Sequence, residues 1–498
     1  MTTFVQHLPD NDRTAVVTPD GHLTYRQLGQ RINRLARVLA HRGIGPERVC
    51  VVALERGADP VVAIAAIVRA GAAFLAVDVD QPDGRIATFV RGAHAVVTSP
   101  ALAGRMAGLD LPETVLLDGD RIDGGTRDTE GPVVELPAAV APRSLAYVGH
   151  TSGSTGTPNA VLIEHRWLHP YLRFIARDYG LGPDTVALQL APLGFDAAIR
   201  DTFAPLVAGG TLVLLPRATL LRPADLFAAL AAYRVNTMLS ATPTLLSFLA
   251  GQPGSAAHLA GLRLVATTGE AVRPFLAAGG RELMPGRMIN QYGPTEITMT
   301  ATRFEVPGEP ETADIIGRPI DAVPVRLLDA ELRPVPPGAD GEICIGGPGV
   351  ARGYADAPAL TAERFVPDPD GPPGTRLYRT GDLARRRPDG TLEFRGRRDR
   401  QIKIRGYRID PGEIEGVLLS HPDVTGAAVT TAADGRARPY LVAHLTGDLA
   451  AVTDAALRFH LARTLPPHMM PRRFDRRVRF PTTRTGKIDR LALAGESR

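Results

Sequence analysis

The sequence predicts an α/β fold with two domains. The large N-terminal domain consists of parallel sheets with helices plus a β-barrel-like subdomain, and the small C-terminal domain is α/β. Over roughly the first 300 residues, short apolar runs alternate with helical patterns, as in parallel sheets covered by helices. Beyond Asp399 about a hundred residues remain, enough for a separate core. We therefore expect domains at 1–398 and 399–498.

The first helices and strands follow from local apolar spacing. Leu28, Ile32, Leu35 and Leu39 repeat at helical intervals and predict an amphipathic helix. A buried strand is expected at 49–54, a helix at 60–70 and a second strand at 73–77. Further strand-like runs lie at 115–117, 212–215, 237–240 and 262–266.

The pattern changes after Pro319. Short strands are expected at 325–329, 341–345 and 392–394, and Pro and Gly turns separate them. This spacing predicts the barrel-like β subdomain.

The composition is that of an ordinary globular protein. Hydrophobic residues make up 44% and charged residues 22% of 498 residues, and the net charge of +4 is too small to indicate nucleic-acid binding. Cys50 and Cys344 lie in apolar runs and are expected in the core rather than in a disulfide or metal site. No signal peptide or membrane-spanning run is recognisable, so we expect a cytoplasmic protein without a membrane partner.

Lysine is almost absent. Of the 57 basic residues, only Lys403 and Lys487 are lysine. Arginine is a planar fork, whereas lysine is a compact point charge on a flexible stem. The pattern predicts that these two positions need a charge that arginine cannot replace.

A loop rich in glycine and hydroxyl groups separates the apolar runs 145–148 and 160–163. A turn of this composition can present amides and hydroxyls to anionic oxygens. It comprises Thr151, Ser152, Gly153, Ser154, Thr155 and Gly156. It matches no Walker motif, because the Gly486-Lys487 pair is followed by Ile488. By itself the loop is either a phosphate site or a polar surface loop.

Six further motifs follow this loop in a defined order. They are Gly194-Phe195-Asp196, the run from Asn290 to Glu296, 341–347, 378–382, 396–403 and 481–487. With these motifs, nearly the whole chain resembles the adenylate-forming enzymes. The resemblance is closest to a stand-alone, amino-acid-activating adenylation domain of nonribosomal peptide synthetases.

The resemblance implies ATP-dependent formation of an aminoacyl-AMP with release of pyrophosphate. Two anions must meet in this reaction, so cations and hydrogen-bond donors are needed. The loop 151–156 would hold phosphates, with Thr151 in the catalytic set. Glu296 would bind Mg²⁺, and Lys487 would lie between the substrate carboxylate and the phosphate.

The resemblance also assigns the nucleotide contacts. Tyr292 would stack on adenine and Asn290 would accept from its amine. Asp382 would take the ribose hydroxyls, and Arg397 would support the ribose and phosphates. The remaining members of the ATP site would be Gly269, Glu270, Gly293 and Thr295.

Asp196 matches the position that, in amino-acid-activating members of this family, pairs with the ammonium group of the substrate. The rest of the pocket would be Ala197, Arg200, Ser240, Ala266, Thr268, Gln291, Met299 and Thr300. This polar set suggests a polar or acidic side chain on the substrate. Two interpretations of Arg200 are open: it pairs with a second substrate carboxylate, or it forms an ion pair with Asp196 or turns outward.

The resemblance further implies a second half-reaction, in which the acyl group is transferred to the thiol of a partner. Asp399 matches the hinge of a mobile small domain, Lys403 lies on the strand that faces the site after rotation, and Gly406 matches the entrance for a phosphopantetheine thiol. Only eleven residues follow Lys487, so a separate carrier protein is expected.

One motif departs from the family. The loop ends Pro158-Asn159-Ala160, where the family has Pro-Lys-Gly. This departure motivates one alternative, a nucleotide-binding homologue with impaired catalysis. A second alternative, independent of the loop, is a carboxylate:CoA ligase of the same fold.

Overall fold

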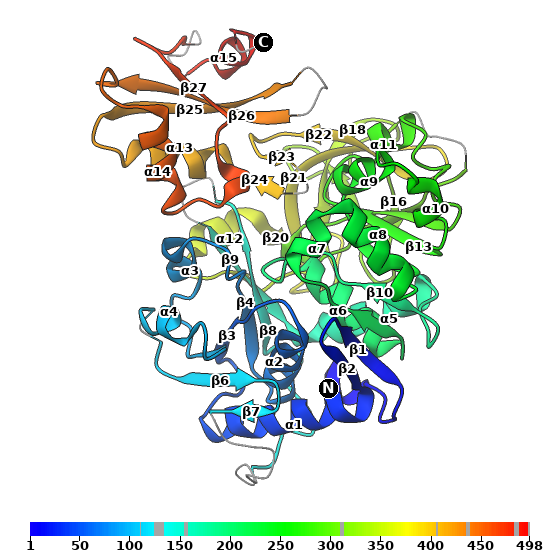
Figure 1. Ribbon diagram of the computed structural model, residues 1–498. Coiled ribbons are helices and arrows are strands. Elements are labelled where there is room, and N and C mark those ends of the chain that lie inside the picture. The colour runs from blue at the N-terminus through cyan, green and yellow to red at the C-terminus, as the bar shows by residue number, and fades with distance from the viewer. Residues whose placement is uncertain are drawn as a thin grey trace. The chain divides into compact units, whose positions relative to one another are not determined.

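The computed structural model describes residues 1–109, 111–123, 134–153, 158–308, 313–404, 407–434, 439–482 and 488–496 (Figure 1). The chain divides into two compact units. The large unit comprises 1–78, 92–150 and 160–398, and the small unit comprises 79–91, 151–159 and 399–498. Among the residues described, there is no helix with the length and apolar character that crossing a membrane requires.

One sheet lies near the start of the chain and has the strand order β19-β9-β8-β4-β3-β5-β6-β7. Its central pairs, β4 with β3 and β3 with β5, are parallel, as the alternation of strands and helices predicts. The strands are β3 (Val49–Ala53), β4 (Ala73–Ala76), β5 (Ala95–Thr98), β6 (Thr114–Asp118), β7 (Arg121–Ile122), β8 (Leu145–Thr151), β9 (Asn159–Glu164) and β19 (Gly353–Tyr354).

The larger sheet joins a parallel half to an antiparallel half. The neighbours β11, β10, β12, β13 and β14 are parallel, and β15 begins the antiparallel half. The parallel half and its edge are β1 (Thr14–Thr18), β2 (Gly21–Thr24), β10 (Val186–Leu188), β11 (Thr211–Val213), β12 (Thr237–Ala241), β13 (Leu264–Thr268) and β14 (Arg287–Tyr292). The antiparallel half is β15 (Thr302–Glu305), β16 (Ile315–Pro319), β17 (Val325–Leu328), β18 (Asp340–Ile345), β20 (Phe365–Pro367), β21 (Arg376–Arg386) and β22 (Leu392–Arg397).

The β strands expected after Pro319 are present, but in the described residues they do not close into a barrel. Their order, β17-β18-β21-β22-β16-β15, is an open path. The reason is that β16 pairs with β22 on one side and with β15 on the other, which joins these strands to the larger sheet.

Helices α1 and α2 show how local sequence sets the elements of the large unit. The Thr24 side chain accepts a hydrogen bond from the Gln27 amide and begins α1, whose apolar face is buried. The described helices of this unit are η1 (Phe4–His7), α1 (Tyr25–His41), α2 (Ala58–Arg69), α4 (Ala103–Ala107), α5 (His165–Asp178), α6 (Ala197–Val207), α7 (Arg217–Leu221), α8 (Pro223–Ala232), α9 (Pro243–Ala250), α10 (Ser255–Leu259), α11 (Arg273–Ala277), η2 (Thr295–Ile297) and α12 (Pro358–Arg364). Cys50 and Cys344 are buried and free, as expected.

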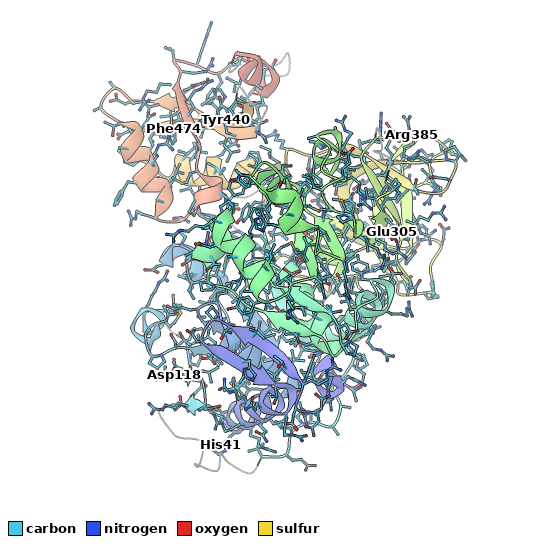
Figure 2. The ribbon with its side chains drawn as sticks, turned by 45° about the vertical axis from the view of Figure 1, so that its right-hand side comes forward. His41, Asp118, Glu305, Arg385, Tyr440 and Phe474 are labelled. Atoms are coloured by element: carbon cyan, nitrogen blue, oxygen red, sulfur yellow. The ribbon has the colours of Figure 1, made fainter. Side chains whose placement is uncertain are left out.

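The small unit has its own apolar core, centred on a three-stranded sheet in the order β25-β26-β27. Tyr440 and Phe474 lie on strands of this sheet (Figure 2). The guanidinium groups of Arg472 and Arg458 cover their rings, at 4.9 and 5.1 Å from the ring centroids. Its elements are α3 (Asp83–Phe89), β23 (Ile402–Ile404), β24 (Tyr407–Ile409), α13 (Pro411–Leu419), β25 (Val424–Ala433), β26 (Pro439–Gly447), α14 (Asp454–Ala462), η3 (Pro467–Met469), β27 (Arg473–Arg476) and α15 (Arg490–Glu496).

Candidate functional site

The loop between β14 and β15 is held in one conformation. A side chain on Gly293 would come within 2.2 Å of the Met299 carbonyl oxygen, so only glycine fits. Thr298 and Met299 adopt positive φ angles of 64° and 76°, which cost free energy and persist where surrounding structure enforces them. The Ala301 amide donates to the Tyr292 carbonyl at 2.8 Å and closes the loop. Besides Gly293 itself, the loop carries four predicted site residues, Thr295, Glu296, Met299 and Thr300.

Tyr292 lies next to the two charged residues predicted to hold the ribose. Its hydroxyl donates to Asp382 Oδ2 at 2.6 Å, and Arg397 forms an ion pair with Asp382 Oδ1. Asp382 and Arg397 are direct neighbours on β21 and β22. Burial, together with the charge of Asp382, raises the pKa of Tyr292 well above its ordinary value. The hydroxyl therefore keeps its proton and acts as a hydrogen-bond donor.

Asn290 is buried two residues before Tyr292 on β14. Its Nδ2 donates to the Ile315 carbonyl at 2.8 Å, and its Oδ1 accepts from the Thr267 hydroxyl at 3.2 Å. An amide oxygen has two lone pairs, so one further donor could still bind there.

Glu296 is fully buried in η2. The Tyr354 hydroxyl donates to its Oε1 at 3.0 Å, and its backbone oxygen accepts from the Ala351 amide at 2.9 Å. Within the described ranges, no group of three or more His, Cys, Asp or Glu side chains could hold a metal. A single carboxylate still fits Mg²⁺, which commonly takes one or two carboxylates together with substrate phosphates.

Gly269 and Glu270 follow the end of β13, beside the end of the parallel strand β14. Gly269 has a φ of 87°, a conformation that favours glycine. The Glu270 carboxylate accepts from the amide and the hydroxyl of Thr244, at 2.9 and 2.7 Å. The structure therefore shows Glu270 bound to the first turn of α9.

Asp196 immediately precedes α6 but makes no N-cap hydrogen bond. Its Oδ2 is buried and has no hydrogen-bond partner. Burial raises the pKa of Asp196, whereas a hydrogen bond with Thr295 and the charge of Arg200 lower it. A buried carboxylate oxygen without a partner is unfavourable, and an ammonium group would satisfy it.

Arg200 lies one turn further along α6, and its side chain is buried, with 1% exposed. Its guanidinium donates to Ser240 Oγ at 2.7 Å and to the Leu239 carbonyl at 3.1 Å. It also donates to Tyr171 Oη at 3.3 Å and to Thr300 Oγ1 at 3.2 Å. Arg200 therefore neither turns outward nor forms an ion pair with Asp196, and that interpretation was wrong. The two side chains share a face of α6, but the acceptors on neighbouring elements hold the guanidinium.

Three other polar residues of the predicted pocket, Gln291, Thr300 and Ser240, are hydrogen-bonded within the protein. The Gln291 amide donates to the Leu239 carbonyl at 3.0 Å, and its oxygen accepts from Thr300 at 3.3 Å. Ser240 donates to Asp201, whose other oxygen accepts from two backbone amides, at 3.0 Å each. Of the remaining lining residues, Ala266 and Met299 are buried, and Ala197 and Thr268 are partly exposed.

Two members of this network were missed by sequence analysis. Asp201 follows Arg200 directly, and an acidic residue in the apolar turn of a helix could have indicated a buried partner. Tyr171 lies on α5, 29 residues before Arg200, and no local pattern connects the two. Only the packing of α5 against α6 brings them together.

The predicted residues of the small unit are described only in part. Thr151 Oγ1 is buried without a partner, Ser152 donates to the Arg408 carbonyl at 3.2 Å, and Asp399 accepts from the Gln401 amide at 3.2 Å. Gly153 is described, and Lys403 is described as part of β23 through its backbone. The remaining predicted residues, Ser154, Thr155, Gly156, Gly406 and Lys487, lie outside the described residues.

The sequence matches the models of two related protein families. Residues 4–355 match the AMP-binding enzyme model, and residues 413–487 match that of the AMP-binding enzyme C-terminal domain. The chain belongs to the AMP-binding enzyme family. It is therefore an adenylate-forming enzyme, and the family resemblance read from the motifs is confirmed.

Curated relatives of this AMP-binding enzyme include a dimodular nonribosomal peptide synthase of Bacillus subtilis, 37% identical over 489 residues, a match covering 97% of this chain and 20% of that protein. The chain is 42% identical over 489 residues to phosphinothricin tripeptide synthetase PhsC of Streptomyces viridochromogenes, a match covering 97% of this chain and 44% of that protein. The chain spans less than half the length of the curated relatives that it matches.

Solved structures agree on the fold. Amide bond synthetase McbA from Marinactinospora thermotolerans superposes with a TM-score of 0.87 at 24% identity, covering 99% of each chain. An artificially fused adenylation-PCP di-domain, NpsA-ThdA from Klebsiella oxytoca, superposes with a TM-score of 0.79 at 25% identity, covering 95% of this chain and 92% of that one. The predicted α/β class is confirmed.

Proposed function

We propose that this AMP-binding enzyme uses ATP and Mg²⁺ to activate an amino acid as aminoacyl-AMP, and then passes the aminoacyl group to the phosphopantetheine thiol of a carrier protein. The observation that carries the proposal is the buried Oδ2 of Asp196, which has no partner. A substrate ammonium would supply both the missing hydrogen bond and the opposite charge. A carboxylic acid without an amino group would leave this oxygen unsatisfied.

The nucleotide part of the proposal rests on Tyr292, Asp382 and Arg397. The two Asp382 oxygens already accept from Tyr292 and Arg397, which orients the carboxylate. Each oxygen keeps a second lone pair for a ribose hydroxyl. Glu296 would hold Mg²⁺, which offsets the phosphate charge when it is bound.

Charge distribution supports an anionic partner for the C-terminal part. Residues 399–498 contain 17 basic and 11 acidic residues, a net charge of +6, whereas the whole chain carries +4. A phosphopantetheine arm carries a phosphate, and a net positive charge favours encounter with such a partner.

The test is amino-acid-dependent exchange of pyrophosphate into ATP, with a panel of α- and β-amino acids and the matching acids that lack the amino group. We expect exchange with at least one amino acid and none with its deaminated analogue. Asp196→Asn should lower kcat/KM for the amino acid about 10- to 100-fold, because a charged hydrogen bond is lost. Asp184→Asn, at an exposed position, is the control.

The acceptor is tested separately. After activation, thioester formation is measured with a phosphopantetheinylated carrier protein and with free CoA. A product formed only on the carrier supports the proposal. Efficient transfer to free CoA would instead identify a carboxylate:CoA ligase, and equal activity on deaminated acids would contradict the role of Asp196.

A further inference from the structure

Arg200 occupies the predicted amino-acid pocket with its own side chain. It is among the largest fully buried side chains of the described residues, with 1% exposed. Its guanidinium reaches Ser240 on β12 and Thr300 on the loop after β14. Both residues belong to the predicted walls, so the guanidinium lies between these walls.

The hydrogen bonds of this guanidinium are nearly complete without a substrate. A guanidinium has five N–H donors, and four of them are used by Leu239, Ser240, Tyr171 and Thr300. Only one N–H of Arg200 is left without an acceptor. A substrate carboxylate binds arginine best through two parallel N–H groups, so it would have to displace existing partners.

The charge of Arg200 is also balanced within the protein. Ser240 accepts from Arg200 and donates to Asp201, so one hydroxyl links the cation to a carboxylate. Asp201 is anchored by the amides of Leu190 and Ala191, at 3.0 Å each. The buried cation therefore has a nearby anion without an acidic substrate.

Three polar residues of the pocket walls also have their hydrogen-bonding groups occupied by partners within the protein. Gln291 donates to the Leu239 carbonyl and accepts from Thr300, and Thr300 also accepts from Arg200. Ser240 accepts from Arg200 and donates to Asp201, and each of the three wall residues is at most 6% exposed. Apart from Asp196 Oδ2, the one Arg200 N–H and the hydroxyl of the partly exposed Thr268, the side chains of this pocket offer few polar groups to a long polar substrate.

We infer that Arg200 fills the far end of the amino-acid pocket and restricts the substrate to amino acids with small side chains. This inference rests on the proposed function and specifies its substrate class. Asp196 binds the ammonium group at the start of α6, and Arg200, one turn along the helix, occupies the space that a long side chain would need. The side chain of Arg200 thus sets the length of the pocket.

The experiment measures selectivity in pyrophosphate exchange. Glycine, alanine, β-alanine and 2-aminobutyrate are compared with leucine, phenylalanine, aspartate and glutamate. For the wild type we expect exchange with one or more of the small substrates. Arg200→Ala should raise kcat/KM for leucine relative to alanine by at least about 10-fold, because each methylene accommodated in a pocket is worth roughly 10- to 200-fold.

A second variant keeps the test valid if Arg200→Ala does not fold. Arg200→Gln keeps hydrogen-bond donors near Ser240 and is shorter, so it should shift the ratio in the same direction by less. Arg222→Ala, which removes a 75% exposed arginine on the surface, is the control for both. Thermal unfolding is recorded for each variant, and the Gln variant decides if the Ala variant does not fold.

The outcomes separate the inference from the function on which it rests. Wild-type preference for leucine or phenylalanine overturns the inference and leaves amino-acid activation intact. Preference for aspartate or glutamate that is lost in Arg200→Gln also overturns it, because Arg200 then binds the substrate carboxylate. Absence of exchange with every amino acid overturns the proposed function and the inference together.

Discussion

The Tyr292 hydroxyl donates a hydrogen bond to Asp382 at 2.6 Å, although 90 residues separate the two in the chain. The tyrosine ends β14 of the parallel half of the larger sheet, and the aspartate lies on β21 in the antiparallel half. The geometry between the Tyr292 ring and the predicted ribose site therefore depends on a contact between the two halves of one sheet.

We expect Tyr292→Phe to keep the ring and lose this hydrogen bond. A hydrogen bond to a charged group is worth about 1.5–3 kcal/mol, so the free energy of unfolding should fall by roughly that amount. The KM for ATP should rise severalfold with little change in KM for the amino acid. Tyr147→Phe is a matched control, because the buried Tyr147 hydroxyl has no partner. Equal stability losses in the two variants would contradict a special role for the Tyr292–Asp382 bond.

The role of Lys487 in adenylation can be tested with Lys403, the only other lysine of the sequence, as the control position. Lys487→Ala should lower amino-acid-dependent exchange by about 100- to 1,000-fold, because a cation at the developing charge is lost, while ATP still binds. Lys487→Arg should rescue poorly, since the fork cannot take the place of a compact charge. Lys403→Ala should retain exchange. Near wild-type exchange in Lys487→Ala would remove this residue from the mechanism.

Asn159, at the start of β9, stands where the family has lysine. We expect Asn159→Lys to leave exchange equal or faster, because it adds a cation beside a loop proposed to hold phosphates. Asn33→Lys on α1 adds the same charge elsewhere and should have no effect. Initial exchange rates at saturating amino acid are the measurement. A large loss confined to Asn159→Lys would mean that the loop requires asparagine.

His165, the first residue of α5, makes stability depend on pH. Burial lowers the pKa of His165 to about 4, from an ordinary value of 6.5. Between these values the unfolded chain binds the proton and the folded chain does not, so stability is complete above pH 6.5 and falls as the pH drops toward 4. The loss from this residue approaches about 3 kcal/mol. Chemical unfolding at pH 7.5, 6 and 5 measures it.

The control for this prediction is the exposed His22 on β2. His165→Gln should reduce the pH dependence, and His22→Gln should leave it unchanged. Part of the dependence should remain in His165→Gln, because burial also lowers the pKa of His169 to about 4. A wild type whose stability is constant from pH 7.5 to 5 would contradict the prediction.

Much of the architecture could be predicted from local patterns. The apolar spacing of α1 and the runs that form β3, β4 and β13 depend on neighbours within a few residues, and such periodicity is readable without a structure. The open path of β17, β18, β21, β22 and β16 was not readable. Pairing between distant strands produces no pattern in the local sequence. The short strands and turns therefore suggested a barrel, although the strand order is open.

The order of residues was sufficient to predict the α/β class, the family through its ordered motifs, and the residue types available for binding anions. It was not sufficient to predict where Arg200 directs its charge, which depends on the three-dimensional packing. Helical spacing put Arg200 on the same face as Asp196, but its acceptors come from Tyr171, 29 residues earlier, and Thr300, 100 residues later. A buried guanidinium binds whichever acceptors the packing brings to it, and packing joins segments that the order of residues keeps apart.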